Sequence, residues 1–211
     1  MNILKPQKIL FNNLRKIDNL LEDLKDNDIE NINIENYKKE NIKFNDITIA
    51  KSIINSTELI NSNLENNTFI DIEFNNCNFS NTSFERCSFI RCEFNNCKLT
   101  GCNFTQNRIH NVSFVETNIN YANLSMASIE NVIFENTLLR NSNFQENKLK
   151  NIIFKQADLT QAVFFKTSLK EIDLSDSIIE GIVVTIQDIK GATINQFQAI
   201  DLLYLLGVKV K

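Results

Sequence analysis

The chain has 211 residues, of which 43% are hydrophobic and 23% are charged, and its formal net charge is -4. This length fits one domain with a small appendage, and the composition is too apolar for a disordered chain. The mildly acidic charge argues against direct nucleic-acid binding through phosphate contacts. The sequence contains no run of about 18 apolar residues, so we expect no membrane span. The N-terminus lacks the features of a signal peptide, so we expect a cytoplasmic protein.

The N-terminal region carries an apolar pattern that is typical of a helix over residues 7–25. The residues expected on one face of that helix are Leu10, Leu14, Ile17, Leu21 and Leu24. Pro6 stands near the expected start, where proline is tolerated. We interpret residues 1–40 as a helical region that caps the repeats that follow. A helix that docks onto a partner is the alternative.

A period of five residues begins at Phe44 and continues without a change of register to Ile194. Every fifth residue over this range is apolar, which gives 31 successive positions. At 43% hydrophobic composition, the chance probability of such a run is roughly 10^-11. Helices repeat every 3.6 residues and strands every 2, so neither explains the pattern. A period of five fits a chain that turns a corner in each repeat and points one large side chain inward.

Four such sides close a square coil of about 20 residues, and successive coils would pair as parallel strands. Residues that differ by 20 should then stack in interior columns. One column contains Phe74, Phe94, Phe114, Phe134 and Phe154. The column on the opposite wall contains Phe44, Phe84, Phe104, Phe144 and Phe164. The other two walls carry mostly Ile and Leu.

The remaining positions of the repeat agree with this coil. Small side chains stand two residues before each large one and should also point inward. Asn or Gly is frequent two residues after the large one, and both tolerate the left-handed backbone angles of a corner. All five cysteines occupy the small inward position: Cys77, Cys87, Cys92, Cys97 and Cys102. We therefore expect buried, reduced thiols that serve only in packing.

Catalytic and metal-binding groups are not evident in the sequence. Zinc sites favour ligand pairs two to four residues apart, usually with histidine, whereas the single histidine, His110, is at an outward position. A filled coil also offers no concave site for catalysis. We expect no catalytic residue, no cofactor, no bound metal and no enzymatic activity.

The repeat units resemble those of pentapeptide-repeat proteins, whose pattern is A(D/N)LXX. Matching units are ANLSM (122–126), ADLTQ (157–161) and CNFTQ (102–106). The resemblance covers about residues 41–194 and implies an all-β fold, a right-handed quadrilateral parallel β-helix of about eight coils. A short N-terminal helix and a C-terminal helix over residues 195–211 would flank it.

The segment GATINQFQAIDLLYLLGVKV, residues 191–210, resembles the C-terminal end of the quinolone-resistance (Qnr) and McbG-type members. This resemblance implies a helix that caps the coil and joins two copies into a homodimer. We expect Asn195 as its N-cap and Gly207 as its stop. The residues expected at the dimer interface are Phe197, Ile200, Leu203, Tyr204 and Leu206. Packing of the helix on its own coil alone is the alternative.

The same resemblance implies a DNA-mimicking modulator of DNA gyrase or topoisomerase IV, of the kind that gives quinolone protection, and so antibiotic resistance, or toxin immunity. The candidate partner-facing acidic residues form two columns and are Glu65, Glu73, Glu85 and Glu93. Residues 41–194 contain 17 acidic and 13 basic residues, so the rod is only slightly acidic. A structural or interaction scaffold with a different protein partner is the alternative.

Overall fold

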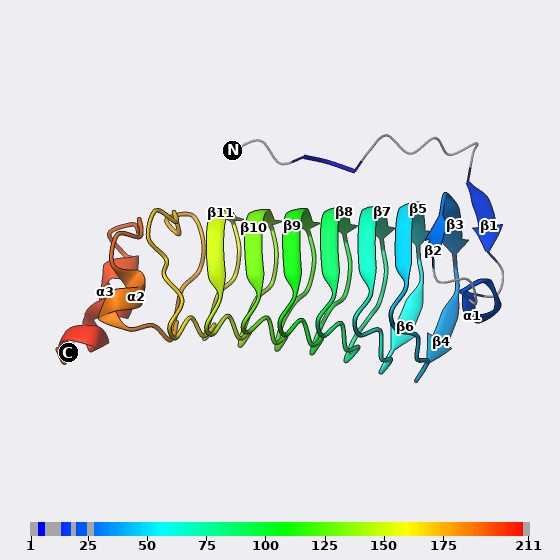
Figure 1. The fold of residues 1–211 in the computed structure, drawn as a ribbon. Coiled ribbons are helices and arrows are strands. Elements are labelled where there is room, and N and C mark those ends of the chain that lie inside the picture. Colours follow the sequence, from blue (N-terminus) through cyan, green and yellow to red (C-terminus); the bar gives the residue numbers. More distant parts are fainter. Residues whose placement is uncertain (1–3, 7–13, 18–19, 25–27, 209–211) are drawn as a thin grey trace.

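The protein is a rod built from stacked parallel coils. A computed structural model describes residues 4–6, 14–17, 20–24 and 28–208. The rod has about seven turns, against about eight expected, and Figure 1 shows them side by side along one axis. The strands are β1 (Arg15–Ile17), β2 (Asp28–Glu30), β3 (Ile32–Glu35), β4 (Lys38–Glu40), β5 (Thr48–Asn55), β6 (Glu58–Ile60), β7 (Thr68–Asn75), β8 (Ser88–Asn95), β9 (Arg108–Val115), β10 (Ser128–Glu135) and β11 (Lys148–Lys155). The helices are α1 (Leu20–Asp23), α2 (Ile186–Ile189), α3 (Gln198–Leu202) and the 3₁₀ helix η2 (Leu203–Leu206).

One long parallel sheet forms two adjoining sides of the rod. Its strand order is β1-β3-β5-β7-β8-β9-β10-β11, with β2 paired to β5. From β5 onward each strand pairs with the next at a shift of 20 residues, so Phe94 lies opposite Phe74 and Phe114. The other two sides have the short pair β4 and β6 and then single bridges such as that between Asn103 and Asn123.

The corners occupy the position where the sequence places Asn and Gly. From Asn31 to Glu171, residues two positions after each inward apolar residue have φ between +47° and +69°. Asn111 (φ 56°) and Gly101 (φ 69°) are examples, but larger side chains such as Tyr121 (φ 60°) adopt the same conformation. This left-handed region costs non-glycine residues roughly 1–2 kcal/mol each, so the stacked coils must compensate for strain at many corners.

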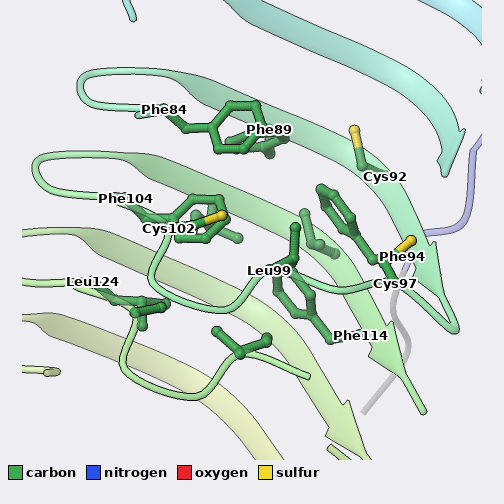
Figure 2. Close-up of a cluster of buried hydrophobic side chains, with 14 of the residues drawn as sticks. Phe84, Phe89, Cys92, Phe94, Cys97, Leu99, Cys102, Phe104, Phe114 and Leu124 are labelled. Carbon is green, nitrogen blue, oxygen red and sulfur yellow. The ribbon is translucent and has the colours of Figure 1, made fainter. Parts of the chain in front are cut away.

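The interior is filled by stacked rings. Phe74, Phe94, Phe114, Phe134 and Phe154 form one column, with neighbouring ring centroids 4.4–5.2 Å apart and planes within 13° of parallel. Figure 2 shows several of these rings beside buried leucines and cysteines. A third wall, expected to be mostly Ile and Leu, also carries a stacked pair, Phe69 and Phe89, at 4.9 Å. In these coils the rings of adjacent walls meet edge to face, as between Phe69 and Phe74 at 6.0 Å. This arrangement fills the tube without a channel.

The N-terminal region differs from the expected helix over residues 7–25. Arg15–Ile17 is strand β1, paired with β3, and Leu20–Asp23 is a single helical turn. Residues 7–13, including Leu10, lie outside the described residues. The spaced leucines arise because Ile17, Leu20 and Leu24 are buried against the open end of the coil, not on one face of a helix. Of the residues expected on the apolar face, Ile17 and Leu24 are buried and Leu14 is half-buried, whereas buried Leu20 was not among them.

The coil also starts earlier than the five-residue pattern indicates. Strand β2 pairs with the start of β5, and Ile29 and Ile34 are buried. Lys39, which interrupts the apolar pattern, lies opposite Leu59 but is exposed. A charged residue is tolerated there because this coil is close to the end of the stack.

Candidate functional site

The cysteines serve as hydrogen-bond donors inside the wall of the coil. Cys87, Cys97 and Cys102 donate from Sγ to the carbonyl oxygen 23 residues earlier, at 2.9, 3.4 and 2.9 Å. Thr117 makes the same bond from Oγ1 to the carbonyl of Phe94 at 3.1 Å. Cysteine and threonine thus fill one structural role, and the row of thiols does not converge on a single point.

Burial also makes three of these thiols poor nucleophiles, whereas a hydrogen bond with Cys97 lowers the pKa of Cys77. Desolvation raises the pKa of Cys87, Cys92 and Cys102 to about 12. At neutral pH they remain protonated, and a protonated thiol is neither a nucleophile nor a metal ligand. Within the described ranges, no group of three His, Cys, Asp or Glu residues could hold a metal ion. His110 is on the outer surface of β9, with Nδ1 3.6 Å from Glu130 Oε2.

The acidic column of Glu65 and Glu85 is paired with a cation. Arg86 lies between the two carboxylates: its Nη2 is 3.3 Å from Glu65 Oε2, and its Nη1 contacts Glu85 Oε1. Its Nε donates to Asn66 Oδ1 at 2.8 Å. The guanidinium therefore compensates much of the negative charge of this column.

The second acidic column, Glu73 and Glu93, lies on the long sheet. The two residues are direct neighbours in β7 and β8. Lys5 Nζ is 3.5 Å from Glu93 Oε1. Burial raises the pKa of Glu73, the charge of Glu93 raises it further, and Lys5 acts in the opposite direction. The charged form of Glu73 is therefore disfavoured in the folded protein.

Ion pairs between neighbouring coils continue along the rod. The side chain of Asp71 is only 2% exposed, and Arg91 binds it through two hydrogen bonds of 2.6 and 2.7 Å. Further pairs join Lys150 to Glu130 at 2.5 Å, Lys155 to Glu135 at 2.6 Å, and Lys166 to Glu146 at 2.9 Å. The described surface is consequently a mosaic of both charges, in contrast to the uniformly negative surface of DNA.

The C-terminal end closes the coil with one side of its helix and exposes the other. Asn195 Oδ1 accepts from the backbone N–H of Gln198 at 3.1 Å, and Gln198 Oε1 accepts from the N–H of Asn195 at 2.8 Å, so the two residues bond reciprocally before α3. The N-cap of α3 itself is Phe197, two residues after the expected Asn195. Gln198 Nε2 also donates to the carbonyls of Leu174 and Ser177 in the last coil. Gly207 ends the segment at φ 69°.

The exposed side of this end is apolar. The exposed residues are Phe197 (73%), Ile200 (57%), Tyr204 (49%) and Leu206 (67%). Leu203 is half-buried, and Leu202 and Leu205 pack against the core. Tyr204 Oη donates to the carbonyl of Ile182 at 2.7 Å, which fixes its ring beside the final coil. We call the four exposed residues the C-terminal apolar end.

Cavities in the described parts of the chain are either very small or open. A void of about 20 Å³ within the tube is lined by apolar side chains such as Leu20 and Phe79. A surface groove of about 240 Å³ lies where Leu4 and Lys5 meet β8 and β9. The helices of the described ranges are too short to cross a bilayer. The sequence did not predict that Lys5 and Asn111 belong to a groove, because their contacts join segments about a hundred positions apart.

Comparison with known proteins identifies the repeat. Residues 87–164 match the model of the pentapeptide repeat region. The structure is similar to HetL, a pentapeptide repeat protein involved in heterocyst differentiation regulation from the cyanobacterium Nostoc sp. strain PCC 7120. The TM-score is 0.67 at 14% identity, covering 86% of this chain and 91% of HetL, and this likeness concerns the fold alone.

Two further structures share less of the geometry. A trypsin-treated variant of QnrB1, a plasmid-mediated fluoroquinolone resistance protein, matches with a TM-score of 0.45 at 19% identity, over 85% of this chain and 98% of that one. A pentapeptide repeat protein from the Arabidopsis thaliana thylakoid lumen gives 0.34 at 16% identity, over 63% and 72%. No curated protein matches the chain.

Proposed function

This chain is a pentapeptide-repeat protein, and we propose that it is a non-enzymatic rod that pairs with a second copy through its C-terminal apolar end and binds another protein along its sides. The observation that carries this proposal is the concentration of exposed apolar side chains in the short C-terminal segment. Fold alone does not assign function, so the proposal depends on this surface.

A second copy is the occupant that fits the C-terminal apolar end. Figure 1 shows α3 at the tip of the rod, so a twofold axis through the tip would bring the α3 segments of two copies together. Phe197, Ile200 and Leu206 would then leave water, each at a gain of roughly 1.5–3 kcal/mol when fully buried. The reciprocal hydrogen bonds between Asn195 and Gln198 hold the start of the helix in place for such contact.

The molar mass in solution tests the pairing. Light scattering after size-exclusion chromatography should give twice the chain mass of 24.4 kDa for the unaltered protein. The double variant Phe197→Ser, Ile200→Ser should give one chain mass, because each change removes apolar contact at the tip. Met126→Ser is the matched control, since Met126 is also exposed (54%) but lies on a side of the rod. A single chain mass for the unaltered protein would remove the pairing from the proposal.

A DNA-mimicking modulator of DNA gyrase or topoisomerase IV is the second candidate. The stacked carboxylates of Glu65 with Glu85 and of Glu73 with Glu93 favour it, because DNA presents regularly spaced negative charges. The compensating cations Arg86 and Lys5 weaken the mimicry, so we rank this function below binding to another protein.

The gyrase supercoiling assay distinguishes the two candidates. Purified protein would be added at low to high micromolar concentrations, with and without ciprofloxacin. We expect no change in supercoiling in either condition. Inhibition, or protection from the drug, that is lost in Glu73→Gln, Glu93→Gln would instead establish the topoisomerase function and the role of this acidic column.

A further inference from the structure

Residues 4–6, near the start of the chain, lie along the side of the rod. Figure 1 shows the short segment that contains residues 4–6 beside the middle strands, far from β1. The backbone N–H of Leu4 donates to Asn111 Oδ1 on β9 at 3.4 Å, across 107 residues of sequence. Lys5 Nζ lies 3.5 Å from Glu93 Oε1 on β8. An extended segment is thus seated across two coils.

The surface beneath this segment is suited to a positive charge. Glu73 and Glu93 are direct neighbours in adjacent parallel strands, where like charges are destabilising. The side chain of Glu93 is only 19% exposed, so its charge is partly shielded from water. A cation placed between such carboxylates relieves their repulsion, as Lys5 does here.

The same surface also offers a polar anchor for backbone. Asn111 is only 3% exposed, while Asn131, at the same corner one coil further, is half-buried. The side-chain oxygen of Asn111 accepts a hydrogen bond from the backbone N–H of Leu4. Because the donor is a backbone group, a peptide of any sequence except proline at this position could make the same bond. The groove of about 240 Å³ extends past Leu4 to Ile133 and Glu135, so the N-terminal segment covers only part of it.

The N-terminal segment is held weakly. Leu4 is 57% exposed, and the side chain of Lys5 is 82% exposed. An exposed ion pair of this kind contributes little to stability and is screened by salt. Within the described residues 4–6, the polar contacts to the rod are this exposed ion pair and one long hydrogen bond, which a better-fitting ligand can displace.

We propose that the groove across β8 and β9 is a binding site for an extended segment of a partner protein that carries a lysine or arginine beside an apolar residue, and that Leu4 and Lys5 occupy this site in the free protein. The basic side chain lies against Glu73 and Glu93, the backbone binds Asn111, and the apolar residue lies toward Ile133. This site specifies which kind of partner segment binds to one side of the rod. It therefore rests on the proposed function, in which the sides of the rod bind another protein.

A peptide probe tests the site in the full-length chain. The probe is fluorescein-labelled NILKPQ, the sequence of residues 2–7, and the readout is fluorescence anisotropy at low salt. Lys5→Glu repels the chain's own segment from Glu93 and should free the groove. We expect about fivefold tighter binding of the probe to this variant than to the unaltered protein, the factor that corresponds to losing a weak competing contact in cis.

Two further variants test whether the probe binds at Glu93. Adding Glu93→Gln to Lys5→Glu should remove most of the gain, whereas adding Glu85→Gln, a matched change in the other acidic column, should keep it. The probe NILEPQ, with the lysine replaced, should not bind. Equal binding to the unaltered and Lys5→Glu proteins, or binding that survives Glu93→Gln, would overturn the proposal. None of these substitutions touches the C-terminal apolar end, so the molar mass would still report the pairing of two chains separately.

Discussion

Phe114, in the middle of the rod, is 2% exposed and stacks between Phe94 and Phe134, whereas Phe197, at the C-terminal end, is 73% exposed and has no ring contact among the described residues. The middle coils bury their large side chains against copies of themselves. The two ends have a coil on one side only. They are covered by other elements, β1 and α1 at one end and α3 at the other. The difference teaches that the repeat supplies its own stability, while each end needs an added element, or a second copy, to cover its last coil.

The largest expected effect comes from emptying the middle of the tube. Phe114→Ala should lower the free energy of unfolding by about 3–5 kcal/mol, because the coils above and below prevent collapse of the cavity. Phe197→Ala is the matched control and should cost less than about 1 kcal/mol when the chains are kept apart by dilution. Urea unfolding followed by circular dichroism measures both. Similar losses for the two variants would contradict the contrast between middle and end.

Alkaline pH should weaken the middle coils through their thiols. Burial raises the pKa of Cys102 to about 12, compared with about 8.5 for a free cysteine. Between these values the unfolded chain releases a proton that the folded chain retains, so stability is complete below about pH 8.5 and falls as pH rises toward 12. One such group contributes a slope of about 1.4 kcal/mol per pH unit.

Unfolding in urea at pH 7.5, 9 and 10, under reducing conditions, measures this slope. Cys102→Ala should be less sensitive to alkaline pH than the unaltered protein by about 2 kcal/mol between pH 8.5 and 10. Thr117→Ala, at an equivalent inward position without a thiol, should retain the original slope. An unchanged slope in Cys102→Ala would mean that this thiol reaches water in the folded protein.

A smaller difference in stability is expected between glycine substitutions at a corner in the middle of the rod and at its C-terminal end. Gly101 and Gly207 share φ 69°, but an added Cβ at Gly101 would lie 2.5 Å from Asn81 Oδ1, whereas at Gly207 it would meet nothing within 4 Å. Alanine at both sites carries the left-handed strain, about 1 kcal/mol. Gly101→Ala should therefore cost more than Gly207→Ala in thermal unfolding. The reverse order would show that the corner at Gly101 yields easily.

The smallest expected effect concerns Glu73. Burial and the neighbouring charge of Glu93 raise its pKa, so the charged form is disfavoured in the folded state. The unaltered protein should gain stability relative to Glu73→Gln as pH falls from 6 to 4, by a few tenths of a kcal/mol, since the site is partly open to solvent. Glu180→Gln, at an exposed position near the C-terminal end, should show no such trend. A flat difference for Glu73 would indicate that its carboxylate is not disfavoured.

The sequence predicts the middle of the rod because every coil repeats the same constraint. The apolar period places Phe94 over Phe74, and the same period locates the left-handed corners that Asn111 and Asn131 occupy. An error in one repeat would be evident from its neighbours. Because the sequence repeats internally, the fold and its register can be predicted from the sequence alone.

The ends and the candidate groove could not be read in this way. Leu20 and Leu24 fit a helical period equally well, yet Arg15–Ile17 is a strand because β3 offers an unpaired edge. The contact of Lys5 with Glu93 joins residues with no periodic relation. The charge of Glu65 and Glu85 suggested an acidic surface, but Arg86, next to Glu85 in the chain, also reaches Glu65 in the adjacent coil. Such contacts depend on tertiary placement, which a local pattern does not encode.

Hydrogen exchange of backbone amides tests the central claim, that the coil is self-sufficient and its C-terminal end is completed by a second copy. In the unaltered protein, amides of β8, β9 and β10 should exchange only through global unfolding, and those of α3 should also be protected. In Phe197→Ser, Ile200→Ser, protection should be lost in α3 alone, while the coil amides keep theirs. Equal and rapid exchange of α3 in both proteins would contradict the account, because the end would then be open in the absence of any substitution.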